Sequence, residues 1–140
     1  MGLANIFSFA ALIMFTPLEA FIVVIIRTLL GAVFAGNMSQ LLYSFTGGVV
    51  SMAISSILTY TAHPKISVMA VSVIAAVAHN VTQILVYSLL TASTLTFAYM
   101  PYFALLGILS GAIVGGVTMI IFRGVPQSVF EKVIRKKISV

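Results

Sequence analysis

The strongest constraint on this chain is the absence of charge from two long, mostly apolar runs. Residues 28–64 and 66–122 contain no Asp, Glu, Lys or Arg, and Lys65 alone separates them. A short soluble domain cannot bury so much uncharged sequence, whereas the hydrocarbon layer of a bilayer, about 30 Å thick, accommodates roughly 20 apolar residues per helix. The composition agrees, because 61% of the residues are hydrophobic and 6% are charged. The sequence therefore predicts an all-α integral membrane protein.

Five hydrophobic segments predict a polytopic bundle of about five helices in one transmembrane domain. Their expected bounds are about 2–15, 18–35, 38–62, 66–90 and 97–122, followed by a basic tail at 123–140. The breaks between them contain typical turn and helix-end residues, namely Thr16-Pro17, Gly36-Asn37, His63-Pro64-Lys65 and the polar residues 91–96. The first segment is short for a full span.

The positions of the cations predict the orientation of the helices. Four of the seven lie in the last nine residues, namely Lys132, Arg135, Lys136 and Lys137. Positive residues next to a span mark its cytoplasmic side and contact anionic lipid. With the tail in the cytoplasm of a plasma-membrane protein, five crossings also place Lys65 in the cytoplasm. Gly36-Asn37 and residues 91–96 then lie outside.

The same residues argue against several classes of function. The net charge of +5 does not indicate nucleic acid, because the cations are concentrated beside the membrane. The chain has no Asp and no Cys, its carboxylates are Glu19 and Glu131 only, and His63 and His79 lack metal-ligand spacing. It also has no P-loop. We expect neither catalysis nor a bound cofactor or metal.

Polar side chains inside the spans are costly and need a reason to be there. Arg27 lies near the middle of the second segment, and His79 lies at a similar depth in the fourth. On this basis the sequence predicts seven ligand-binding residues, some of them toward the outer ends of the helices. They are Asn5, Arg27, Asn37, His79, Asn80, Gln83 and Tyr87. Two interpretations remain open, hydrogen bonds that lock helices together and contacts to a ligand. For Asn37, a turn role after glycine is a further alternative.

Small residues recur every four positions on the fifth segment, at Gly107, Gly111 and Gly115. Such stripes let helix backbones approach closely in lipid. They predict either packing within the bundle or contact with a partner membrane protein.

Several motifs resemble, in order, those of the Gx transporter family over roughly residues 2–120. They are Gly2-Leu3-Ala4-Asn5-Ile6, Glu19-Ala20, Arg27, Leu30-Gly31, Phe34-x-Gly36-Asn37, Gly47-Gly48 and Ala76-Val77-Ala78-His79-Asn80 with Gln83. That family is similar to the S components of energy-coupling factor (ECF) transporters. It is also catalogued as heptaprenyl diphosphate synthase component I. Because the chain has no Asp, the second name implies an accessory membrane subunit here.

The resemblance implies a six-helix bundle that captures a small molecule from outside, working with a transmembrane coupling protein and two ATPase subunits. In that family the first motif follows another helix, so we expect either a truncated N-terminus or a bundle of about five helices that lacks the first one. The predicted function is a substrate-binding subunit of an ECF-type uptake transporter for a vitamin-like or cofactor-precursor molecule. The alternatives are an accessory subunit of heptaprenyl diphosphate synthesis and a structural bundle without a ligand.

Overall fold

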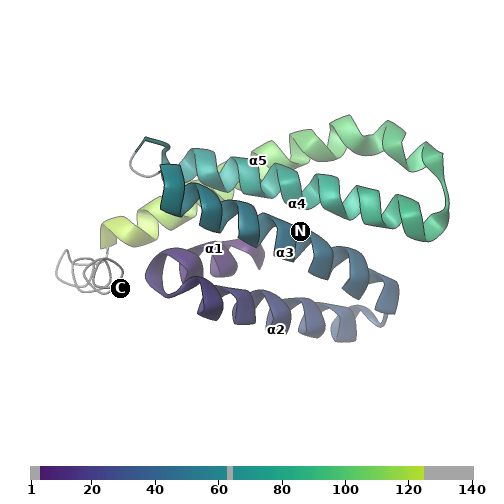
Figure 1. Cartoon of the computed structure of the whole chain (residues 1–140), viewed down its shortest axis with the longest axis horizontal. Helices are drawn as coiled ribbons and strands as arrows, with labels where there is room; N and C mark the ends of the chain where they lie inside the picture. The colour runs from purple at the N-terminus through teal and green to yellow at the C-terminus, as the bar shows by residue number, and fades with distance from the viewer. Residues whose placement is uncertain (1–3, 63–64, 125–140) are drawn as a thin grey trace.

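The computed structural model describes residues 4–62 and 65–124, which form five α-helices and one 3₁₀ helix (Figure 1). Their bounds are α1 Ala4–Met14, α2 Pro17–Ala35, α3 Met38–Ala62, α4 Val68–Thr91, η1 Thr94–Tyr99 and α5 Met100–Gly124. Four stretches of this part of the chain are long and apolar enough to cross a bilayer, namely Pro17–Ala35, Met38–Thr61, Val68–Thr91 and Thr94–Ile121. The predicted all-α membrane bundle is confirmed. Residues 125–140 of the basic tail and the His63-Pro64 break lie outside the described residues.

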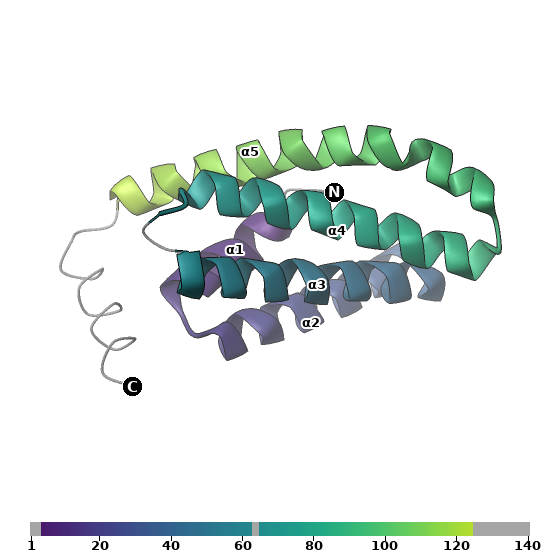
Figure 2. The same ribbon diagram turned by 45° about the horizontal axis from the view of Figure 1, so that its top comes forward.

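The four long helices lie side by side in chain order (Figure 2). α4 packs against both α3 and α5, and α2 packs against α3, while α1 contacts α2, α3 and α5. One apolar cluster joins the first three helices through the buried side chains of Leu12, Val24 and Met52. Large apolar side chains such as Phe34 and Ile120 are exposed on the outside, where a bilayer would cover them.

The described part of α1 is shorter than a full span, as the sequence indicated, and it is not among the four stretches that are long and apolar enough to cross a bilayer. Its 11 residues rise about 17 Å at 1.5 Å per residue, roughly half of the hydrocarbon layer. Because α1 leads directly into α2, its first turn lies partway along the bundle and not at the end where α2 meets α3 (Figure 2). The predicted sides of Lys65 and Gly36-Asn37 do not change, because they follow from counting back from α5.

The helix ends and turns lie at the residues that predicted them in the sequence. Thr16 caps α2, and its backbone N–H and hydroxyl both donate to Glu19 Oε2, at 2.8 and 3.1 Å. Pro17 occupies the first turn of α2, where no backbone donor is needed. Gly36 ends α2 in the left-handed region at φ 64°, which suits a residue without a Cβ. These caps satisfy backbone groups where lipid or headgroups meet the helix ends.

The segment expected to be a loop at 91–96 is more ordered than the sequence suggested. α4 continues to Thr91, a short turn at Ala92 and Ser93 follows, and the 3₁₀ helix then leads into α5. The Ser88 hydroxyl donates to the Ser93 carbonyl at 2.8 Å, and this hydrogen bond stabilises the turn. Pro101 is the second residue of α5, a position where proline is tolerated.

Candidate functional site

Arg27, His79 and Gln83 are brought together by two glycines of α3. A Cβ atom placed on Gly47 would lie 2.9 Å from Gln83 Cγ and 3.1 Å from His79 Nδ1. A Cβ atom on Gly48 would lie 3.6 Å from Arg27 Nη2. Because Gly47 and Gly48 have no side chains, α3 leaves room for Arg27 from α2 beside Gly48 and for the two α4 residues beside Gly47. The sequence predicted that Arg27 and His79 lie at similar depth, and the structure places both beside Gly47-Gly48.

The centre of this group is polar and shielded. His79 is 6% exposed, and its Nδ1 atom makes no hydrogen bond within the described residues. The His79 Nδ1 atom lies beside Gly47, and the Arg27 guanidinium lies beside Gly48, the next residue of α3. Arg27 and Gln83 are half-buried. This arrangement places a fixed positive charge and several hydrogen-bonding groups between α2, α3 and α4.

Asn80 lies on a different side of α4 from this group. Its Nδ2 donates to the Phe103 carbonyl of α5 at 3.0 Å, and the side chain is half-buried. A residue adjacent to His79 in the sequence is rotated by about 100° around the helix, so it meets another neighbour. The structure therefore uses the Asn80 amide to join α4 and α5.

Two of the remaining predicted residues, Tyr87 and Asn37, make contacts with residues outside the Arg27 and His79 group. Tyr87 is 46% exposed and packs edge to face on Tyr43 of α3, with ring centroids 6.0 Å apart. Asn37 is exposed, and its Oδ1 accepts the Ser39 backbone N–H at 3.0 Å. That bond is an Asx turn at the start of α3, which is the turn role considered for Asn37. Asn5 is the second residue of α1.

The glycine stripe of α5 is occupied by α4. Cβ atoms on Gly107, Gly111 and Gly115 would lie 2.8, 2.5 and 3.0 Å from the Cα atoms of Val77, Val73 and Met69. The Ser72 hydroxyl donates to the Gly111 carbonyl at 2.9 Å across the same contact. Of the two interpretations of the stripe, the structure shows packing within the bundle. It is not a surface open to a partner protein.

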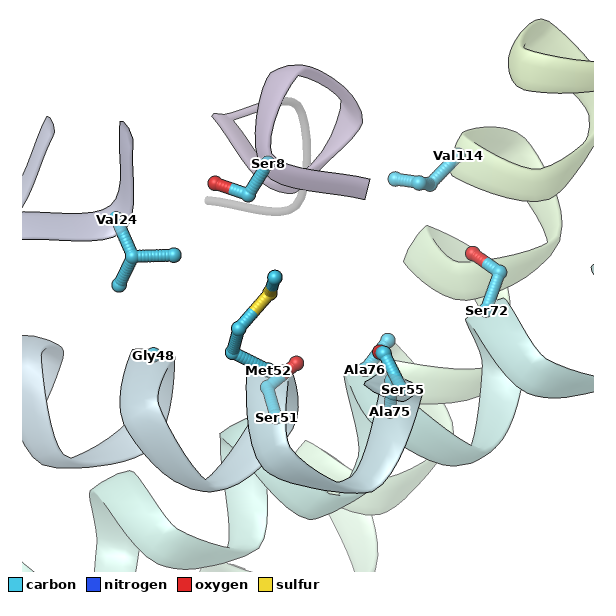
Figure 3. A pocket seen from close by; sticks show the side chains of 10 residues that line it. All are labelled: Ser8, Val24, Gly48, Ser51, Met52, Ser55, Ser72, Ala75, Ala76 and Val114. Carbon is cyan, nitrogen blue, oxygen red and sulfur yellow. The ribbon is translucent and has the colours of Figure 1, made fainter. Parts of the chain in front are cut away.

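A small cavity lies beside the Arg27 and His79 group, and Gly48 belongs to both (Figure 3). Its volume is about 20 Å³, and its walls come from all five α-helices. Its lining residues are Ser8, Val24, Gly48, Ser51, Met52, Ser55, Ser72, Ala75, Ala76 and Val114. Sequence reasoning did not identify the cavity, because serines such as Ser8 and Ser72 look like ordinary small packing residues. Their only signal was a hydroxyl group in an otherwise apolar helix.

The side chains gathered here offer charge and hydrogen-bonding groups to a ligand. Arg27 offers planar charged donors, Gln83 offers an amide, and His79 donates or accepts according to its tautomer. Within residues 4–62 and 65–124, no three His, Cys, Asp or Glu side chains are grouped so that they could hold a metal ion. The group is therefore suited to hold a polar molecule by hydrogen bonds and charge.

Comparison with known proteins gives one match. The family model for heptaprenyl diphosphate synthase component I matches residues 1–121. No curated protein and no solved structure matched the chain. Since the match spans most of the 140 residues, the chain belongs to the heptaprenyl diphosphate synthase component I family.

Proposed function

We propose that this chain is the substrate-binding membrane subunit of an ECF-type uptake transporter for a small vitamin-like or cofactor-precursor molecule. The observation that carries the proposal is the grouping of Arg27, His79 and Gln83 around Gly47-Gly48, inside spanning helices. Ionisable residues are expensive at such depths, and where they occur they usually mark a path or site for a ligand. Buried hydrogen-bonding groups converging from different helices are typical of small-molecule sites.

The site is closed in the described arrangement. Pockets for drug-sized ligands have volumes of about 300–1,000 Å³, whereas the cavity beside Arg27 measures about 20 Å³. A ligand therefore needs α2 or α4 to move away from α3. The contacts at Gly47 and Gly48 suit such a movement, because no α3 side chain interlocks with Arg27 or His79 at those positions.

The proposed transporter needs a coupling membrane protein and ATPase subunits, because this chain carries no nucleotide-binding motif. The α5 glycine stripe is filled by α4, so the partner must bind elsewhere. The exposed apolar side chains of α2, among them Leu29, Val33 and Phe34, are available to lipid or to that partner.

The family description supports a second candidate, an accessory membrane subunit of heptaprenyl diphosphate synthesis. In that case the chain would bind a catalytic partner, and the polar group would hold helices together or contact a prenyl diphosphate. The two candidates make different predictions for the purified protein. A transport subunit should retain a small molecule, whereas an accessory subunit should stimulate prenyl chain elongation by a catalytic partner.

The first test is to replace Arg27 with glutamine. We expect the wild-type protein, purified in lipid nanodiscs, to retain a small molecule that mass spectrometry detects. Losing a hydrogen bond to a charged group costs about 1.5–3 kcal/mol, so Arg27→Gln should retain that molecule about ten- to a hundred-fold less well. Arg123→Gln is the matched control, because Arg123 is an exposed cation in the last turn of α5.

Asn80→Ala separates binding from packing. We expect it to lower the melting temperature while the small molecule is still retained, because Asn80 bonds to Phe103.

If the wild-type protein retains nothing, but its addition stimulates prenyl chain elongation by a catalytic component, the transport proposal is wrong and the accessory role is favoured.

The proposed orientation is tested separately by cysteine labelling, since the chain has no native cysteine. Asn37 and Lys65 are both exposed, at opposite ends of α3. We expect a membrane-impermeant maleimide to label Asn37→Cys in intact cells and to label Lys65→Cys only after permeabilisation. Labelling of Lys65→Cys in intact cells would reverse the orientation.

A further inference from the structure

The connection between α4 and α5, residues 89–99, exposes apolar and aromatic side chains at one end of the bundle. Leu89 of α4 and Leu95 of η1 are 81% and 79% exposed, and Phe97 and Tyr99 of η1 are exposed as well. Within η1 no residue is buried. Turns that lie in water are usually built from polar residues. The composition of this connection therefore indicates that something other than water covers it.

The same connection carries no charge, and two of its hydroxyl interactions are completed within the protein. Residues 66–122 include no Asp, Glu, Lys or Arg. The Thr91 hydroxyl donates to the Tyr87 carbonyl at 2.9 Å, and the Ser88 hydroxyl donates to the Ser93 carbonyl at 2.8 Å. These hydroxyls do not need bulk water as an acceptor, so the connection is compatible with a partly dehydrated environment.

The length of α4 places the connection at the level of the lipid headgroups. α4 has 24 residues, which rise about 36 Å at 1.5 Å per residue, whereas the hydrocarbon layer is about 30 Å thick. A typical tilt of about 20° shortens that rise by only about 2 Å. Measured from its start at Val68, near Lys65, α4 therefore ends beyond the hydrocarbon. The α4–α5 connection also projects farther than the connection between α2 and α3 (Figure 1, Figure 2).

The exposed surface of η1 continues an exposed stripe on α5. Tyr102, Leu105 and Leu109 are exposed and recur every three or four residues, whereas the glycine stripe of α5 lies against α4. These residues belong to the apolar span Thr94–Ile121, whose outer side a bilayer covers. Tyr99 lies three residues before Tyr102 and is exposed as well. The lipid-facing surface of α5 therefore extends into η1.

We propose that η1, with the adjoining ends of α4 and α5, lies in the headgroup region of the bilayer and binds lipid there. Leu95 and Phe97 contact the upper parts of the acyl chains. Tyr99 and Tyr102 lie among the headgroups, where the apolar ring and the polar hydroxyl of tyrosine both find suitable surroundings. The connection then fixes the depth and tilt of the bundle in the membrane. This inference does not depend on the proposed function.

The test measures the depth of nitroxide labels, since the chain has no native cysteine. Leu95→Cys carries the label in η1, Ile113→Cys is the hydrocarbon reference and Lys65→Cys is the water reference, and all three positions are exposed. Electron paramagnetic resonance of the purified protein in lipid nanodiscs compares collisions with oxygen, which concentrates in lipid, and with a water-soluble nickel chelate. We expect the oxygen-to-nickel ratio at position 95 to be several-fold above that at position 65 and several-fold below that at position 113. Tyr99→Cys provides a second label in η1 and should give a ratio in the same range.

Three results would overturn the proposal. A ratio at position 95 equal to that at position 65 would place the connection in water, and a ratio equal to that at position 113 would place it in the hydrocarbon. Shielding of position 95 from both reagents would mean that protein covers it.

A second substitution tests whether the apolar side chains hold the connection in the lipid. With Phe97→Glu, the label at position 95 should shift toward the value at position 65, because a carboxylate favours water over the headgroup boundary. Phe97→Leu is the matched control, because it keeps an apolar side chain and should leave the ratio unchanged. Equal ratios in the two variants would contradict binding of η1 to lipid.

Discussion

Replacing Gly111 with leucine is expected to prevent α4 and α5 from packing. Even a Cβ atom at this position would lie 2.5 Å from Val73 Cα and 3.0 Å from the Ser72 carbonyl oxygen, and neither backbone atom can rotate away. The Ser72 to Gly111 hydrogen bond of 2.9 Å would be lost as the helices separate. Overpacking of this kind costs about 1–3 kcal/mol for small additions, so Gly111→Ala should lower the melting temperature and Gly111→Leu should abolish the folded bundle.

Gly116 provides the matched control on the same helix. A Cβ atom there would have nothing within 4 Å. Alanine favours the helix over glycine by about 0.5–1 kcal/mol, so Gly116→Ala should leave the melting temperature unchanged or raise it. Thermal unfolding of the two alanine variants in the same detergent measures the difference. Equal melting temperatures would mean that α4 and α5 do not meet at Gly111.

Replacing Gly47 with leucine is expected to disrupt the proposed site and the contact between α3 and α4 together. A Cβ atom would lie 3.0 Å from the His79 carbonyl oxygen and 3.1 Å from His79 Nδ1. The nearest atom, Gln83 Cγ at 2.9 Å, belongs to a flexible side chain and can move, but the carbonyl cannot. Gly47→Ala should therefore cost about 1–3 kcal/mol, and Gly47→Leu should also lose the retained small molecule.

Gly31 is the control for this pair of variants. It lies on the exposed side of α2, and a Cβ atom added there would meet nothing within 4 Å. Gly31→Ala should retain both stability and the small molecule, measured by thermal unfolding and mass spectrometry. If Gly47→Leu keeps full retention, the ligand does not bind between α3 and α4.

The helix class could be predicted from the sequence because its signals are local. Uncharged runs specify spans, Pro17 marks the start of α2, and Gly36 marks its end. The approximate depth of Arg27 and His79 also follows from counting residues along a helix of known rise. The structure adds that both lie against α3, since Gly47 leaves space for His79 and Gly48 leaves space for Arg27.

The rotation of each helix could not be predicted, and it decides which residues share a site. Asn80 follows His79 directly but bonds to α5. The stripe through Gly111 could equally have faced another protein, because lipid and a neighbouring helix select the same small residues. The first segment was predicted to be short for a full span, and the described part of α1, with 11 residues, agrees.

The short length of α1 gives the described part of the molecule a tapered form. Beside α1 the described bundle has five helices in cross-section, whereas beyond its first turn the four long helices continue without it. Because α1 contacts α2, α3 and α5, it widens the bundle on one side only. At the end of the bundle away from α1, the described contacts are those of the four long helices and η1 with one another. Fewer packing partners per helix give that end the lower local stability of the described bundle.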